Sequence, residues 1–168
     1  MSLPVIDLLW CQTNKACESG TKWFVGLEKS SYDIEELLNR AKRLKEVWHV
    51  YWILCRLLTE RDRRQWAVDS ARTVLYVCEK EFPENKLPRQ LLDYANKGEK
   101  PLDVELRPLL GYESRGVSAL QAAYMAYHAD ECVVVCEQSM RDAFKAVAKR
   151  ERSKWLREVC NHAIDFLR

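Results

Sequence analysis

The sequence has little of the two residues that interrupt regular structure, glycine and proline. Only five of each occur among 168 residues, whereas disordered and collagen-like chains are rich in both. Apolar residues make up 48% and charged residues 31% of the chain, which is typical of an ordered globular protein. This length suits one domain with a single core, and we expect residues 1–168 to form one.

Long apolar runs and an excess of one charge are also missing. No stretch approaches the roughly 20 apolar residues that a membrane-spanning helix requires, and Asp7 stands where a secretory signal would carry basic side chains. The 27 basic and 25 acidic side chains leave a formal charge of +2, and the basic clusters at 61–64 and 145–154 are interleaved with acids. We therefore expect no membrane association and no nucleic acid as partner.

Cysteine is plentiful, but it is not arranged for disulfides or for a Cys-x-x-Cys motif. The seven cysteines are an odd number, and most fall at apolar positions of helical repeats. Thiols at such positions usually serve as small core side chains. We therefore expect reduced cysteines and a cytoplasmic protein.

Apolar residues recur at helical spacing along most of the chain. The pattern predicts helices over 31–44, 44–58, 60–82 and 88–96, and two or three more after residue 116. Thr59 is expected to cap the third of these helices and Pro83 to end it. The glycines and prolines of 98–116 predict an internal loop. The predicted fold class is therefore all-α, a multi-helix bundle or array of about six to eight helices.

Three consecutive valines at 133–135 are β-branched and could indicate a strand. Their flanks are rich in alanine, and no second strand-like run offers a pairing partner. We therefore favour a buried helical turn at these positions and expect no sheet.

Motifs of common catalytic sites are absent. The chain contains no Gly-x-x-x-x-Gly-Lys-Ser/Thr, Gly-x-Gly-x-x-Gly, Gly-x-Ser-x-Gly or His-Glu-x-x-His segment, and it has three histidines to act as general bases. We expect a protein that is not an enzyme and needs no cofactor. One alternative stays open, a cysteine that meets a histidine in space.

A metal site is the alternative function that the sequence offers. His128, Cys132 and Cys136 follow one another at spacings of four, so all three would share one helix face. The first and last would lie about 12 Å apart along the axis, while zinc holds its ligands at about 2.0 to 2.3 Å. One ion would therefore take a neighbouring pair, joined by Cys160 or His162 from the terminal helix. We favour core or half-buried side chains as the interpretation of these residues.

Glu46 and His49 form a Glu-x-x-His, the pattern that supplies metal ligands in di-iron helical bundles. That architecture needs a second copy, but Glu158 and His162 are four apart instead of three. We therefore expect His49 to lie on a helix surface or to be partly buried.

Tyrosines on a small-residue helix are the candidate for a protein interface. Tyr124 and Tyr127 extend from an alanine-rich stretch that allows a neighbouring helix to approach. A partly exposed ridge of two tyrosines would suit recognition of another protein. The six tryptophans are expected mostly in the core.

Several segments together resemble a group of small all-helical bacterial and phage proteins that are labelled immunity proteins. The segments are Ala16-Cys17-x-x-Gly20-x-x-Trp23, the aromatic helix 48–58, Asp62-Arg63-Arg64, Leu87-Pro88-Arg89 with Ala95 and Gly98, and the run 122–127. They cover most of the chain, although Cys-Val-Val-Val-Cys at 132–136 stands where the group tends to have alanine.

The resemblance implies an all-α fold without catalytic residues and a role in binding and neutralising a toxin or another protein. We therefore expect a protein-binding module of the immunity or inhibitor kind. The alternative is a helical bundle that holds a metal or small ligand around His128, Cys132 and Cys136.

Overall fold

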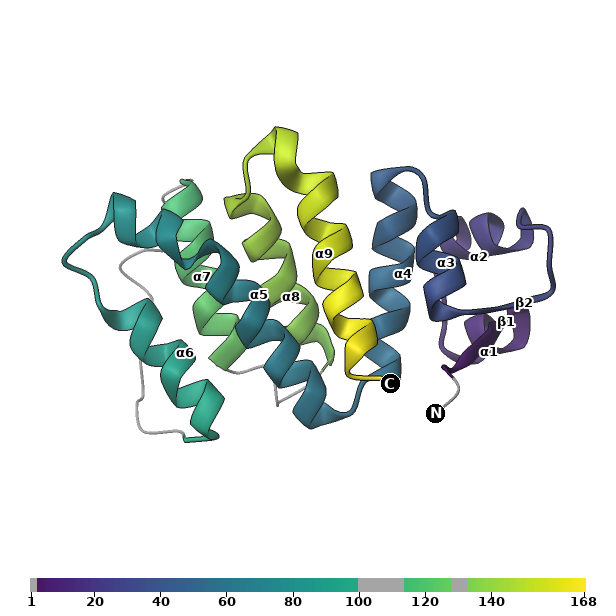
Figure 1. The fold of residues 1–168 in the computed structure, drawn as a ribbon, viewed down its shortest axis with the longest axis horizontal. Coiled ribbons are helices and arrows are strands. Elements are labelled where there is room, and N and C mark those ends of the chain that lie inside the picture. Colours follow the sequence, from purple (N-terminus) through teal and green to yellow (C-terminus); the bar gives the residue numbers. More distant parts are fainter. Residues whose placement is uncertain (1–2, 100–113, 128–132) are drawn as a thin grey trace. The chain divides into compact units, whose positions relative to one another are not determined.

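The computed structural model describes residues 3–99, 114–127 and 133–168. These residues form helices and one small sheet (Figure 1), and the all-α fold class is confirmed. Nine α-helices occur in this part of the chain, more than the six to eight expected, because the first 30 residues add two short ones. None of the described helices is long and apolar enough to span a membrane.

Packing divides the chain into two compact units. Unit 1 comprises Met1–Leu58 and Leu156–Arg168, and unit 2 comprises Thr59–Trp155. A single domain over 1–168 stays a prediction.

Unit 1 contains a two-stranded sheet and mostly short helices. Its elements are β1 Val5–Asp7, α1 Leu8–Thr13, α2 Glu18–Val25, β2 Ser31–Asp33, α3 Ile34–Arg40, α4 Leu44–Leu57 and the end of α9, which spans Arg152–Asp165. The strands pair antiparallel, with Ile6 opposite Tyr32 and both side chains buried. The expectation of no sheet is wrong, because strands of three residues are too short to show an alternating pattern.

Each strand leads directly into a helix through an aspartate. Asp7 Oδ1 accepts a hydrogen bond from the backbone N–H of Trp10 at 2.7 Å, and Asp33 Oδ1 accepts one from Glu36 at 2.8 Å. Aspartate is a favoured cap because its carboxylate satisfies an N–H that no helical carbonyl can reach. The helix predicted from residue 31 therefore begins at Ile34, after the strand.

Two further helix ends of unit 1 are satisfied by charged side chains. Glu46 Oε2 accepts the backbone N–H groups of Lys42 and Arg43 at 2.7 and 2.9 Å, at the start of α4. Arg157 of α9 donates to the carbonyls of Leu38 and Ala41 at the end of α3. A carboxylate at a helix start and a cation at a helix end both complement the helix dipole.

The regular secondary structure of unit 2 is helical in its described residues. Its elements are α5 Glu60–Glu81, α6 Leu87–Lys97, α7 Arg115–Tyr127, α8 Val133–Ala146, the 3-10 helix η2 Lys149–Glu151 and the start of α9. Thr59 Oγ1 accepts the N–H of Asp62 at 3.2 Å, which confirms Thr59 as the cap of α5. The valines at 133–135 open α8, so the helix expected there is confirmed, while Val135 is half-buried and not buried as expected.

The loop predicted at 98–116 is described at its ends alone. Gly98 follows α6 in the left-handed conformation, with φ of 71°, which is the usual place for glycine after a helix. The last two residues of the predicted loop begin α7. Residues 100–113 lie outside the described part of the chain.

Helix α7 packs against α5 and α8 (Figure 1), and its inner face carries small residues. Ala119, Ala122, Ala123 and Ala126 are all fully buried. Ser139 of α8 donates a buried hydrogen bond to a carbonyl in the middle of α7, at 3.0 Å. The distance between packed helices depends on side-chain size at the contact, and alanines allow a close approach.

One position at the start of α7 requires glycine. Glu81 Oε2 of α5 accepts the N–H of Gly116 at 3.0 Å, so a carboxylate lies at the partly positive end of α7. A Cβ on Gly116 would lie 2.5 Å from Glu81 Oε2 and 2.9 Å from Glu81 Cβ. Rotation of the carboxylate would relieve the first contact and leave the second.

The substitution Gly116→Ala should lower the free energy of unfolding by about 1 to 3 kcal/mol, the usual cost of overpacking. The better helix propensity of alanine would offset about 0.5 to 1 kcal/mol of that cost, so the steric effect dominates. Urea denaturation followed by circular dichroism measures the change, with Ser118→Ala on the same helix as control. Equal stability of Gly116→Ala and wild type would contradict the close approach of α5.

Candidate functional site

Of the two tyrosines on α7 that were expected to be partly exposed, only Tyr124 is so. Tyr127 is only 4% exposed and Tyr124 is half-buried. The reason is helical spacing, because Gly116, Leu120, Ala123 and Tyr127 share one face of α7 and all are buried. The expectation of exposure is therefore wrong for Tyr127, and the binding role of both residues stays untested.

The predicted metal ligands fall partly outside the described residues. His128 and Cys132 lie beyond them, and Cys136 is placed in α8 without a described side chain. Cys160 is fully buried and its pKa is raised by burial, whereas His162, two residues further on α9, is exposed. Positions two apart on a helix do not face each other, so these two cannot share one ion. Within the described ranges, no three His, Cys, Asp or Glu side chains form a group that could hold a metal.

Glu46 is used as a helix cap and not as half of a Glu-x-x-His metal motif. Besides the two backbone N–H groups, its carboxylate accepts a hydrogen bond from Arg43 Nε at 2.7 Å. These bonds hold the pKa of Glu46 below its ordinary value, the bond with the Arg43 backbone having the largest effect. Its oxygens are therefore directed to the start of α4.

Three residues of the Ala-Cys-x-x-Gly-x-x-Trp segment surround His49 in unit 1, and we call Cys17, Gly20, Trp23 and His49 the His49 cluster. The rings of Trp23 and His49 stack with centroids 5.6 Å apart and an interplanar angle of 30°. A Cβ on Gly20 would lie 3.3 Å from His49 Nδ1 and 3.5 Å from Cys17 Sγ. The thiol and the imidazole therefore both lie beside Gly20, while the Cys17 thiol hydrogen-bonds with Ser19.

The surroundings of the His49 imidazole disfavour its protonated form. Burial lowers its pKa below the ordinary value of 6.5, Lys45 lowers it further, and Glu46 opposes both effects. Its Nε2 atom is buried and has no hydrogen-bond partner among the described residues. The cluster thus serves first as a packing contact between α2 and α4.

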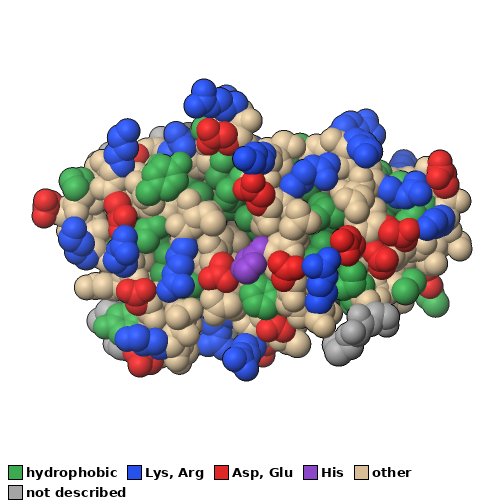
Figure 2. Space-filling model, viewed as in Figure 1, with side chains coloured by type: hydrophobic (Ala, Val, Ile, Leu, Met, Phe, Trp, Pro, Cys, Tyr) green, Lys and Arg blue, Asp and Glu red, His purple; other side chains and the backbone are tan. Residues whose placement is uncertain are grey.

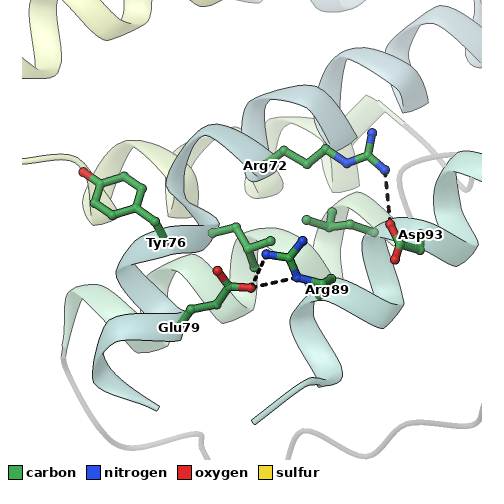
Figure 3. Close-up of a pocket in the computed structure, with 7 residues that line it drawn as sticks. Arg72, Tyr76, Glu79, Arg89 and Asp93 are labelled. Carbon is green, nitrogen blue, oxygen red and sulfur yellow. Dashed lines mark hydrogen bonds and ion pairs between the residues drawn. The ribbon is translucent and has the colours of Figure 1, made fainter. Parts of the chain in front are cut away.

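Tyr76 is the exposed large aromatic residue of unit 2 within its described residues. It is 60% exposed and lies on α5 beside two grooves. Figure 3 shows its ring directed outward, away from the ion pairs that cross the first groove. We call Tyr76 and the residues that line these two grooves the Tyr76 surface.

The first groove lies between α5 and α6 and has a volume of about 280 Å³. Leu75 and Leu92, 8% and 1% exposed, supply its apolar lining. Arg89 donates two hydrogen bonds to Glu79 Oε1, at 2.9 and 2.6 Å (Figure 3). A second pair joins α5 to α6 at 3.4 Å, from Arg72 to Asp93. The groove therefore has an apolar centre between two bridges of opposite charges.

The second groove is larger, about 410 Å³, and lies between α5 and the start of α7. Besides Tyr76 it is lined by Val77, Lys80, Glu81 and Arg115. Tyr76 is thus common to both grooves and separates them. Elsewhere, basic and acidic side chains are interspersed over the face in Figure 2.

Tyr76 was not predicted from the sequence as a candidate, because it does not lie on the apolar stripe of α5. That stripe carries Ala67, Ala71, Val74 and Cys78, all buried. A large aromatic residue on the polar face of an amphipathic helix was the available signal, since such a face usually carries charged side chains.

Comparison of the chain with family models, with curated proteins and with solved structures gives no match. The similarity to immunity proteins stays a prediction.

The stability of the chain should depend on the protonation of His49. Because its pKa is lower in the folded than in the unfolded chain, the unfolded chain binds the proton more readily. The free energy of unfolding should therefore fall as the pH drops below about 6.5, until the folded pKa is passed. His49→Gln should remove this component, which is read from the difference between the two proteins in urea denaturation at several pH values. The prediction would be contradicted if the free energy of unfolding changed with pH by the same amount in His49→Gln and in the wild type.

Cys17 should be the most reactive of the five cysteines with described side chains. It is exposed, and hydrogen bonding, foremost with Ser19, lowers its pKa, whereas burial raises the pKa of Cys11 and raises that of Cys78 to about 11. We expect iodoacetamide to alkylate Cys17 more than about tenfold faster than those two in the folded chain. Peptide mass spectrometry gives the rates, and equal rates before unfolding would contradict the prediction. The same comparison in urea is the control.

Proposed function

We propose that this chain is a non-enzymatic protein-binding module of the immunity or inhibitor kind, and that the Tyr76 surface contacts its partner. The observation that carries the proposal is the exposure of Tyr76, 60%, between two grooves. Tyrosine combines a large apolar area with a hydroxyl, and this combination makes it common among the residues that dominate binding energy.

The surroundings of Tyr76 suit a binding surface. Residues that dominate binding are usually enclosed by a rim that excludes water once the partner is bound. Here the apolar lining of the α5–α6 groove, formed by Leu75 and Leu92, lies between ion-paired side chains that would form such a rim. Arginine is also enriched among the residues that dominate binding energy, and Arg72 and Arg89 both line the α5–α6 groove.

The resemblance of the sequence to immunity proteins supports the same class of function. The segment that carries much of it, Ala-Cys-x-x-Gly-x-x-Trp, builds the packing contact between α2 and α4 around His49. This segment therefore has a structural use in unit 1, while the proposed binding surface belongs to unit 2.

A photoreactive phenylalanine analogue at position 76 should form a covalent adduct with the partner in an extract of the source cells. The same analogue in place of Leu9, which is 69% exposed in unit 1, is the control and should not form that adduct. With the partner identified, Tyr76→Ala should weaken binding by about 2 kcal/mol or more, about 30-fold, as measured by calorimetry.

Two results would contradict the proposal. One is an adduct that forms equally well at both positions. The other is an unchanged affinity of Tyr76→Ala, provided that its circular dichroism and melting temperature match those of the wild type. Leu9→Ala serves as the matched variant for affinity, since it also removes an exposed apolar side chain.

A further inference from the structure

The charge differs between the two sides of Tyr76. The α5–α6 groove is neutral, because each of its two arginines is paired with a carboxylate. The α5–α7 groove holds two cations, Lys80 and Arg115, and one carboxylate, Glu81. A partner that covers Tyr76 therefore meets a neutral side and a positive side.

Within the part of the chain that the structure describes, the positive charge of the α5–α7 groove is compensated only in part, by the carboxylate of Glu81. Arg115 donates its Nε–H to the carbonyl of Ala146 at 2.6 Å, and a neutral acceptor leaves the charge of the guanidinium in place. Lys80 forms no ion pair with a described residue. Glu81 directs one oxygen to the N–H of Gly116, where the N-terminus of α7 adds a further partial positive charge.

We propose that the partner presents an acidic segment to this groove, with an aspartate or glutamate side chain between Lys80 and Arg115. A neutral or apolar part of the same segment covers Tyr76 and the leucine-lined groove on its other side. The inference rests on the proposed function and adds the chemistry of the partner to it.

An acidic protein segment fits this surface better than a nucleic acid does. A nucleic-acid backbone carries a charge at every nucleotide and is bound by surfaces that are positive along its path. Here the positive side chains that form no ion pair with a described residue lie in the α5–α7 groove, whereas the α5–α6 groove has two ion pairs and an almost fully buried apolar lining. Charge complementarity over part of a surface, combined with apolar contact over the rest, is typical of protein recognition.

The test is a selection of random 12-residue peptides displayed on phage against the full chain. The selected peptides should be enriched in aspartate and glutamate, and one of them is then synthesised with a fluorescent label. Its affinity should fall by about tenfold or more in Lys80→Glu, and it should weaken steeply as salt is raised from about 50 to about 500 mM. A second peptide, with Asn and Gln in place of Asp and Glu, should bind at least about tenfold more weakly.

Arg61→Glu is the matched control, because it makes the same change of charge at an exposed position of α5 outside both grooves, about 22 Å along the helix axis from Tyr76 and further from Lys80. It should leave the affinity within about twofold of the wild type, since exposed charges more than a Debye length of about 10 Å from the peptide are screened. Circular dichroism of both variants excludes loss of the fold as the cause.

The outcomes separate this inference from the function on which it rests. Peptides that need Tyr76 but are not acidic, or that bind Lys80→Glu as well as the wild type, overturn the acidic partner and leave the proposed function standing. Peptides that bind equally well to Tyr76→Ala, or no selected peptide at all, count against the Tyr76 surface itself and therefore against both.

Discussion

The close packing of α7 against α5 and α8 determines much of the arrangement of unit 2. Alanines on the inner face of α7 let its neighbours approach, and at its first turn the space is small enough that only glycine fits beside Glu81. The side of α5 that bears Ala67, Ala71 and Val74 is thereby buried. Tyr76 lies on the opposite side of α5. It is exposed because the apolar side of α5 packs against the neighbouring helices and the other side does not.

Much of this arrangement could be predicted from the sequence because it depends on local rules. Thr59 caps α5 through its hydroxyl, Gly98 ends α6 in the left-handed conformation, and the valines at 133–135 begin a helix instead of a strand. Each of these outcomes is decided by residues within one or two turns. The small sheet was missed for the opposite reason, since pairing of Ile6 with Tyr32 joins positions far apart in the chain.

The candidate site was harder to predict than the fold. Whether a tyrosine on a helix is buried depends on which neighbours pack against that helix, so Tyr127 was expected to be exposed and is buried, while Tyr76 was not considered. The His49 cluster was equally hard to predict. Cys17, Gly20 and Trp23 share a face of α2, but the sequence does not show that His49 of α4 is the residue they surround. Contacts between helices depend on the tertiary arrangement, which cannot be predicted from the spacing of residues within one helix.

Helix α9 belongs to both units, since Trp155 is the last residue of unit 2 and Leu156 begins the returning segment of unit 1. The residues that follow, including Val159, Cys160 and Ile164, are part of the unit 1 core, and Arg157 binds the end of α3. Domains generally fold as they leave the ribosome, beginning with the N-terminal one. In this chain the N-terminal unit cannot complete its core until the whole of unit 2 has been synthesised, so the order of folding is expected to be the reverse of the order of synthesis.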